Sequence, residues 1–360
     1  MSRLAFWRLL PLTTPAGAAG EARRAEDEGW TGVGLPDTQS KLPDPYVEMT
    51  VAGLATTGLQ VATAVTNPFT RDAAITAASI CSVHHETGGR ALLGIGRGDS
   101  SLAHLGYAPA PVAVLRCYLD RVQGYLSGRG QEFAGADRTR QEGMRAIGAG
   151  DVAGGPAESR LEWLDPALPK VAVSVAATGP RVIATAAVAA EEVMLAVGVS
   201  AERLSWGIET ARAARAERGL DPAGLRVAAY LPMVVHEDRA VARRLIAGEV
   251  GSYARFSVMR GQVSGPVNDQ ARQVLQKLHS VYDIRQHFTA GSAAARAVDD
   301  EVIDTFAIAG PAGYCVDRLH ELAELGISKV FVLRVGRGID PDLHRQADRD
   351  LVDLVLPRLT

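Results

Sequence analysis

Short apolar segments alternate with longer amphipathic segments along most of the 360 residues. This alternation is typical of βαβ units and a parallel sheet. It predicts eight strands, at residues 4–9, 32–35, 59–66, 91–96, 171–177, 193–197, 226–235 and 329–335. Helices are predicted at 16–28, 71–84, 201–218 and 312–325, three of them followed by a glycine where a C-cap is favoured: Gly29, Gly219 and Gly326. We therefore expect an α/β protein, a (β/α)8 TIM barrel in a single domain over 1–360, with a doubly wound open sheet as the alternative.

Two regions interrupt the alternation. Residues 127–169 are rich in Gly, Arg, Glu and Asp and show little periodicity, and residues 248–309 resemble additional helices with a turn near 261–269. We expect both to be insertions over the C-terminal face of the barrel. Long excursions of this kind are commonly lids or substrate loops, and a solvated surface decoration is an equally good interpretation.

Charge and cysteine content narrow the expected partners and location. The 38 basic and 41 acidic residues are well mixed and give a formal charge of −3, so no nucleic-acid or membrane partner is expected and a small molecule is favoured. Cys81, Cys117 and Cys315 are widely spaced, as in a cytoplasmic protein with reduced thiols. The first 20 residues superficially resemble an export signal, but Arg8 interrupts their apolar stretch, so a first barrel strand is expected instead.

Three of the predicted strands end in polar loops: Thr66-Asn67-Pro68, Gly96-Arg97-Gly98-Asp99 and Thr178-Gly179-Pro180-Arg181. In a closed parallel barrel the loops that follow the strands gather on one face and build the ligand site. The sequence therefore predicts one shared pocket at these loops.

The second and third of these loops have specific chemical interpretations. The segment from Gly94 to Asp99 lacks the third glycine of a dinucleotide fingerprint, which leaves a ligand loop or a tight turn with a surface Arg–Asp pair. Thr178-Gly179-Pro180-Arg181 opens a helix whose free N–H groups, with Arg181, suit a phosphate; a plain capped helix is the alternative. Gly336-Arg337-Gly338 after the last strand is a competing phosphate site.

Asp37 follows the second strand and is the candidate catalytic residue, as a proton donor or hydrogen-bond acceptor; capping of the next turn is an equally good interpretation. His84, His85 and His104 lack the spacing of a metal site, so no metal is expected. No Ser-His-Asp, Cys-His or GxSxG arrangement is visible, which argues against acyl transfer.

Two longer segments carry a family resemblance. Thr66-Asn67-Pro68-Phe69-Thr70-Arg71 and the stretch from Gly88 to Ser100 together resemble the luciferase-like monooxygenase superfamily, and most of all its methylenetetrahydromethanopterin reductase branch, which uses the deazaflavin coenzyme F420 rather than FMN. The resemblance extends over essentially the whole chain.

The resemblance implies a luciferase-like TIM barrel with a non-prolyl cis peptide at Ala64-Val65 behind the deazaflavin ring. It places Asp37 near the reactive ring, Gly96-Arg97-Gly98-Asp99 beside the cofactor, and Thr178-Gly179-Pro180 at its phosphate. The implied cofactor-binding set is Ala64, Val65, Thr66, Asn67, Gly96, Arg97, Gly98, Asp99, Ala177, Thr178, Gly179, Pro180 and Arg181. It also implies a homodimer, and hydride transfer at C5 of the ring.

The chain departs from the family pattern at several positions. Thr38 stands where many deazaflavin members have His, Phe6-Trp7-Arg8 replaces an acidic residue of the first strand, and Glu191-Glu192 replaces an Ala-Asp pair.

From the resemblance as a whole we expect an F420-dependent oxidoreductase acting on a small organic substrate. The alternatives are an FMN-dependent monooxygenase that uses reduced flavin and oxygen, and a flavin-binding barrel without turnover.

Overall fold

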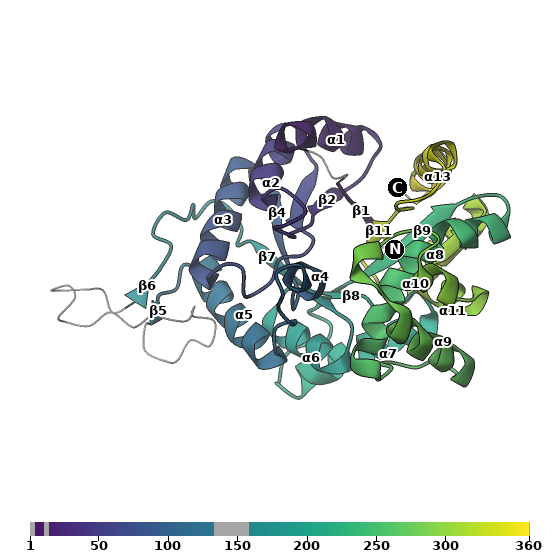
Figure 1. The fold of residues 1–360 in the computed structure, drawn as a ribbon. Helices are drawn as coiled ribbons and strands as arrows, with labels where there is room; N and C mark the ends of the chain where they lie inside the picture. The colour runs from purple at the N-terminus through teal and green to yellow at the C-terminus, as the bar shows by residue number, and fades with distance from the viewer. Residues whose placement is uncertain (1–3, 11–13, 133–157, 360) are drawn as a thin grey trace. The chain divides into compact units, whose positions relative to one another are not determined.

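The computed structural model describes residues 4–10, 14–132 and 158–359 (Figure 1). The chain has the predicted (β/α)8 fold, in which parallel strands alternate with helices, and β9 pairs with β8 to close the sheet. The residues group into two compact units, which are described separately below. Among the described residues, one comprises 4–10, 23–34 and 175–359, and the other comprises 14–22, 35–132 and 158–174.

The first unit contains most of the sheet. Within it β11 pairs in parallel with β1 and with β9, β1 pairs with β2, and β8 and β10 both pair with β9. These strands are β1 (Ala5–Leu9), β2 (Gly32–Leu35, whose last residue belongs to the second unit), β8 (Glu192–Leu195), β9 (Arg226–Val235), β10 (Ile308–Gly310) and β11 (Lys329–Leu333).

The second unit contains the parallel pair β3 (Gln60–Thr63) and β4 (Ala91–Ile95) and the short antiparallel pair β5 (Gln131–Glu132) and β6 (Glu158–Ser159). Strand β7 (Ala172–Ala177) begins in this unit and ends in the first. The helices of the second unit are α2 (Pro45–Leu54), α3 (Ala73–Glu86), α4 (Asp99–Ala103) and α5 (Val112–Leu126).

The remaining helices are α1 (Pro15–Asp27), α6 (Pro180–Ala189), α7 (Ala201–Ala216), α8 (Arg239–Ala254), α9 (Asp269–Val281), α10 (Ala293–Ala297), α11 (Asp300–Phe306), α12 (Ala312–Glu324) and α13 (Pro341–Leu354). Short 3-10 helices are η1 (Arg255–Gly261), η2 (Ile284–Gln286) and η3 (Leu356–Arg358). The three predicted C-terminal glycines all have positive φ, at 84° for Gly29, 68° for Gly219 and 95° for Gly326. This conformation costs glycine little, which explains why these helices end there.

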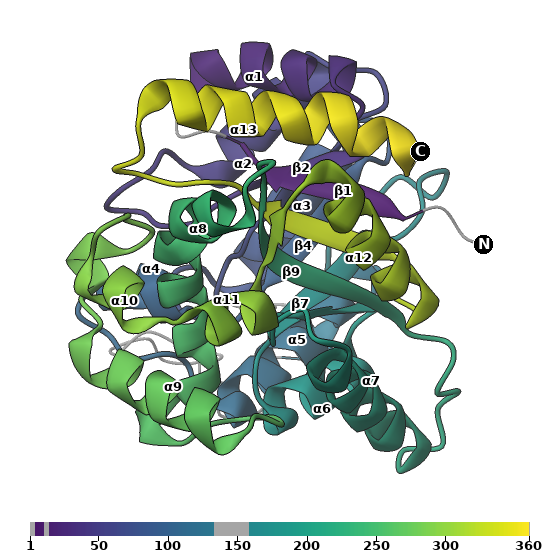
Figure 2. The ribbon, with the colours of Figure 1, turned by 90° about the vertical axis from the view of Figure 1, so that its right-hand side faces the viewer.

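The helical excursion near the end of the chain begins later than predicted. Gly248 lies inside α8, and the additional helices start after it, with α9, α10 and α11 packed together with α8 (Figure 2). Their buried side chains, such as Leu275, Val302 and Phe306, share a hydrophobic core with Val250 and Tyr253 of α8. The segment is thus an integral helical layer of its unit rather than a loosely attached decoration.

The structure also contains a strand that was not expected, β10, and describes only part of the first predicted insertion. Strand β10, a ninth strand of only three residues, was not predicted, because Ile-Ala-Gly carries no readable period. Most of the predicted insertion at 127–169 lies outside the described residues; its described ends form β5 and β6.

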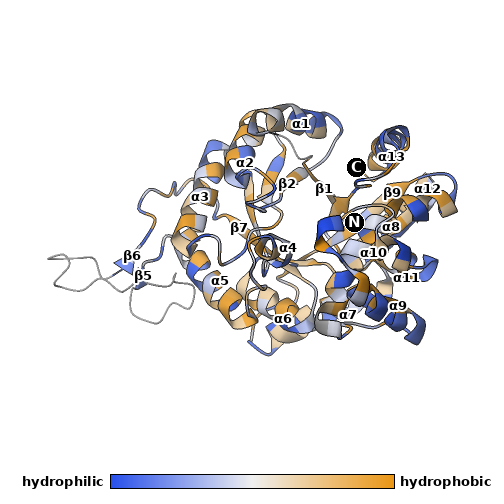
Figure 3. Ribbon diagram, viewed as in Figure 1, coloured by the Kyte–Doolittle hydropathy of each residue, from blue (hydrophilic) through white to orange (hydrophobic). Residues whose placement is uncertain are grey.

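Figure 3 shows hydrophobic residues concentrated in the strands, while α9 and α13 carry many hydrophilic residues. Within the described residues, no helix is both long and apolar enough to cross a membrane.

Candidate functional site

Asp37 lies two residues beyond the end of β2, and its side chain is only 1% exposed. Three side chains donate hydrogen bonds to its carboxylate. Gln39 Nε2 donates to Oδ1 at 2.5 Å, and Thr66 Oγ1 and Arg71 Nη1 donate to Oδ2 at 2.6 Å and 2.7 Å. Side chains from two loops, the one after β2 and the one after β3, therefore meet at one buried carboxyl group.

Arg71 connects this carboxylate to helix α2. Its Nη2 donates to Asp44 Oδ2 at 2.6 Å, and Asp44 is the N-cap of α2, accepting from the backbone N–H groups of Tyr46 and Val47. The guanidinium carbon lies 4.9 Å from the centre of the Tyr46 ring. A guanidinium bound by two carboxylates and an aromatic face has little rotational freedom.

The backbone of Arg71 is fixed as well. Its carbonyl oxygen accepts a hydrogen bond from the Tyr118 hydroxyl at 3.0 Å, and that hydroxyl lies 2.6 Å from Thr76 Oγ1. Tyr118 and Thr76 are fully buried. Helices α5 and α3 thus supply a rigid support beneath the Asp37 cluster.

Burial and charge act in opposite directions on the ionisation of this cluster. Burial raises the pKa of Asp37 above its usual value, while the Thr66 hydrogen bond and the Arg71 charge oppose that rise. Burial lowers the pKa of Arg71, but the carboxylates of Asp37 and Asp44 outweigh it, so the overall direction is upward. Asp37 is therefore a carboxyl group whose protonation depends on its contacts with Thr66 and Arg71.

The end of the third strand contains the expected unusual peptide. The Ala64-Val65 bond is cis, as the resemblance implied. Beyond it, the Thr66 backbone N–H donates to Gly94 O at 3.0 Å, and its carbonyl accepts from the Gly96 N–H at 2.9 Å. A β-carbon on residue 94 would collide with the Thr63 carbonyl oxygen, so only glycine allows this close approach.

Asn67, predicted to bind cofactor, has a structural role in the described contacts. It is fully buried, its Oδ1 accepts from the N–H groups of Phe69 and Thr70 at 3.0 Å and 3.1 Å, and its Nδ2 lies 3.4 Å from Ser101 Oγ. These bonds define an Asx turn that ends the strand segment. Gly98, with φ at 76°, packs against Asn67, where a β-carbon would be 2.6 Å from Asn67 Cβ.

The Gly96-Arg97-Gly98-Asp99 loop leads directly into α4, with Asp99 in the first turn of that helix. Arg97 pairs with Ala110 in both directions: its Nε donates to Ala110 O at 2.5 Å, and the Ala110 N–H donates to Arg97 O at 2.8 Å. In this conformation Arg97 stabilises the loop that precedes α5.

The other predicted cofactor loop belongs to the first unit. Ala177 ends β7, Gly179 is the N-cap of α6 in an extended conformation, and Pro180 is its first residue. Gly179 offers no side-chain cap, and Arg181 is exposed. Pro180 has no N–H, and the Val182 and Ile183 N–H groups both donate to Gly179 O at 3.0 Å. A phosphate at this helix start would therefore be bound by the Gly179 and Arg181 N–H groups.

The competing loop at Gly336-Arg337-Gly338 is less suited to an anion. The Arg337 backbone N–H donates to Phe288 O at 3.1 Å, and Arg337 Nη2 donates to His287 O at 2.6 Å. The carboxyl group of buried Glu249 lies directly against Gly336. A neighbouring carboxyl group and occupied N–H groups leave little for a phosphate to bind.

Histidine and cysteine side chains form no cluster suited to a metal ion in the described part of the chain. His84 Nδ1 lies 3.2 Å from Ala91 O and His84 Nε2 lies 3.0 Å from Pro169 O, so this side chain connects α3 to the start of β4 and to the loop before β7. Cys81 and Cys315 are buried and Cys117 is exposed, all as free thiols.

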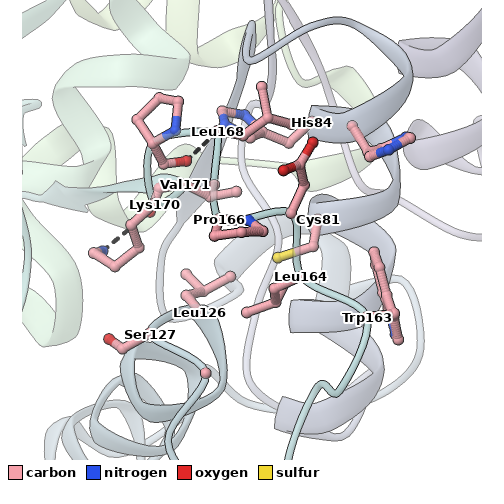
Figure 4. Close-up of a pocket in the computed structure, with 14 residues that line it drawn as sticks. Cys81, His84, Leu126, Ser127, Trp163, Leu164, Pro166, Leu168, Lys170 and Val171 are labelled. Atoms are coloured by element: carbon pink, nitrogen blue, oxygen red, sulfur yellow. Dashed lines mark hydrogen bonds between the residues drawn. The ribbon is translucent and has the colours of Figure 1, made fainter.

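A cavity of about 310 Å³ lies beside His84, between the end of α3, the end of α5 and residues 163–171 (Figure 4). The cavity adjoins the amino ends of β4 and β7, because His84 contacts Ala91, the first residue of β4, and Val171 directly precedes β7. Asp37 and Thr66 instead follow the carboxyl ends of β2 and β3. Its walls are largely apolar, including Leu126, Leu164 and Leu168. None of the predicted site residues lines this cavity.

Sequence reasoning missed three members of the Asp37 cluster: Gln39, Asp44 and Tyr46. Arg71 was noticed in the Thr66–Arg71 motif but received no role. The Asp-Pro pair at Asp44-Pro45 signals a helix start, which could have suggested Asp44 as a cap. No local signal reveals that this cap also binds Arg71.

The fold and the buried carboxylate at the carboxyl ends of the strands define a barrel of the kind that carries its ligand site on that face. Residues 7–329 match the model of the luciferase-like monooxygenase family. The chain belongs to this family.

Two curated relatives are oxidoreductases named 5,10-methylenetetrahydromethanopterin reductase. The protein of Methanolobus tindarius is 26% identical over 321 residues, covering 86% of this chain and 87% of the relative. That of Archaeoglobus fulgidus is 25% identical over 331 residues, covering 88% of each.

Solved structures agree on the fold. The coenzyme F420 dependent tetrahydromethanopterin reductase of Methanopyrus kandleri superposes with a TM-score of 0.70 at 22% identity, covering 100% of both chains. An F420-dependent secondary alcohol dehydrogenase, solved with an F420-acetone adduct, gives a TM-score of 0.68 at 18% identity, again covering 100% of both chains. The EDTA monooxygenase of Chelativorans sp. BNC1 gives 0.64 at 14% identity, covering 99% of this chain and 93% of the monooxygenase.

Proposed function

We propose that this protein is an F420-dependent oxidoreductase that transfers a hydride between the deazaflavin and a small organic substrate. The observation that carries the proposal is the buried Asp37 carboxylate, bonded to Thr66 after the third strand, in a chain whose curated relatives are reductases of this cofactor class. When bound, the deazaflavin would donate or accept the hydride at C5 of its ring.

The residues fit such a group in two places. At the start of α6, the Thr178-Gly179-Pro180 loop would hold the phosphate through the Gly179 and Arg181 N–H groups, which no side chain caps, and the Arg181 side chain would add positive charge. The segment Ala64, Val65 and Thr66 would support the ring, with Gly96, Arg97, Gly98 and Asp99 beside it. Asp37 would accept a hydrogen bond or move a proton at the ring or substrate.

A cofactor titration tests the proposal. Purified protein is titrated with coenzyme F420 and with FMN while fluorescence is followed. We expect F420 to bind with a dissociation constant in the low micromolar range or tighter, about −8 kcal/mol. Tight binding of FMN alone would favour the second candidate, an FMN-dependent monooxygenase; EDTA monooxygenase shares the fold of this chain.

A non-catalytic barrel remains the third candidate, supported by Thr38 and by Phe6-Trp7-Arg8 in place of the usual His and acidic residue. Single-turnover oxidation of bound, reduced F420 by an added organic substrate would eliminate it.

We also propose a cytoplasmic homodimer. The outward positions of α2 and α3 support the dimer, because Val47, Leu54 and Ile75 are 51%, 62% and 57% exposed and no charged side chain stands among the exposed positions before His85. An uncharged face can pair with its own copy across a two-fold axis without placing like charges opposite each other. Light scattering should give about twice 38.0 kDa, and Ile75→Lys should yield monomers, whereas Leu343→Lys on α13 should not.

A further inference from the structure

The three donors to Asp37 differ in how firmly they are held. Thr66 is fully buried, and the Arg71 side chain is 15% exposed. Both donate to Oδ2. Oδ1 instead accepts from Gln39, whose side chain is exposed and lies in the loop after β2. The two carboxylate oxygens therefore have different surroundings: one is enclosed by fixed groups, and the other is covered by a surface side chain.

Both the guanidinium and the backbone carbonyl of Arg71 are fixed by contacts with other residues. Asp44 binds one end of its guanidinium, Tyr46 covers its face, and Tyr118 binds its backbone carbonyl. A guanidinium fixed in this way presents its charge to Asp37 in one orientation, because moving it would break contacts with two helices. The folded structure therefore fixes the position of the Arg71 positive charge relative to the Asp37 carboxylate.

We propose that Arg71 is a positioning residue that keeps Asp37 ionised and oriented, and that Gln39 is a displaceable cover on Asp37 Oδ1. A ligand that presents an N–H or O–H donor, such as a lactam or a hydroxyl group, takes the place of the Gln39 amide. A carboxylate or phosphate is excluded there, because it would face the Asp37 charge at short range. The assignment rests on the proposed function only in taking the redox ligand as the molecule that displaces Gln39.

The Arg71 half of the proposal is tested without any cofactor. The free energy of unfolding is measured between pH 4 and 9 for the wild type, Arg71→Met and Arg71→Lys, each with and without Asp37→Asn. The pH-dependent difference within each pair reports the titration of Asp37. We expect Arg71→Met to move that titration upward by at least one pH unit and Arg71→Lys to move it less.

Arg243→Met is the matched control, since Arg243 also bridges two aspartates, Asp300 and Asp304. It should reduce stability and leave the Asp37 titration in place. A purely structural Arg71 would behave like this control. An unchanged titration in both Arg71 variants would overturn the assignment.

The Gln39 half is tested by titrating Gln39→Ala with F420 and with FMN. Because the covering amide no longer competes, the cofactor that binds the wild type should bind this variant three- to tenfold more tightly. Gln270→Ala is the control, since the exposed Gln270 amide similarly donates to Asp299; its affinity should equal that of the wild type. Equal or weaker binding by Gln39→Ala would refute the cover. If the wild type binds neither cofactor, the proposed function is wrong, and so is the assignment of Gln39 as a displaceable cover. The assignment of Arg71 does not depend on that result, because its test uses no cofactor.

Discussion

The Thr66 hydroxyl donates a 2.6 Å hydrogen bond to Asp37 Oδ2, joining two buried residues that lie 29 positions apart in the sequence. This bond connects the carboxylate after β2 to the segment that follows the cis peptide after β3. A buried acceptor that loses such a donor keeps the cost of its desolvation.

Thr66→Val removes this donor and leaves the size of the side chain almost unchanged. We expect a loss of about 1–3 kcal/mol in the free energy of unfolding near neutral pH, measured by urea denaturation. Thr66→Ser keeps the hydroxyl and should retain most of the stability. Equal stability of the Val and wild-type proteins would show that the bond contributes little.

Asp37→Asn keeps the shape of the side chain and removes its charge. We expect the variant to bind cofactor but to slow hydride transfer by at least tenfold, about 1.4 kcal/mol in activation free energy. Stopped-flow absorbance of bound, reduced F420 during oxidation by substrate measures the step. Unchanged turnover would remove Asp37 from the mechanism.

Arg181→Ala tests the start of α6. If the guanidinium meets the cofactor phosphate, the variant should lose roughly 1.5–3 kcal/mol of binding free energy in the fluorescence titration. Arg212→Ala, an exposed arginine on α7, serves as the control and should bind normally. A dissociation constant unaffected by Arg181→Ala would assign Arg181 to the helix surface.

Glu249 predicts a pH dependence of stability in the first unit. Burial raises the pKa of its carboxyl group to about 8, against an ordinary value of 4.5, although nearby backbone N–H groups oppose the rise. The folded state thus holds a proton that the unfolded state has released, so stability is greatest below pH 4.5 and falls as pH rises to about 8.

Glu249→Gln removes this titration and keeps the shape. Relative to the wild type, the variant should gain stability on the order of 3–5 kcal/mol between pH 4.5 and pH 8, measured by thermal or urea unfolding at each pH. A stability difference that does not vary with pH would mean that Glu249 is ionised in the folded protein.

Much of the fold could be predicted because its signals are local. Strands β2 and β9 match the predicted ranges 32–35 and 226–235, since apolar runs bounded by turn residues need no distant partner to be recognised. The start of the helical excursion could not be placed in this way. Helix α8 continues past Gly248 because its buried face packs on α10 and α11, and that packing overrides the weak helix propensity of glycine.

The sequence by itself determined that a carboxylate, Asp37, follows the second strand, and that glycines lie where the chain must turn sharply or approach closely, as at Gly94 and Gly98. These features depend on neighbours in the chain and on backbone geometry. Only the tertiary structure decided which groups meet Asp37. Gln39 lies in the same loop as Asp37, whereas Thr66 and Arg71 reach it from the loop between β3 and α3. The contacts with Thr66 and Arg71 arise because parallel strands bring distant segments to the same end of a sheet, which no local pattern records.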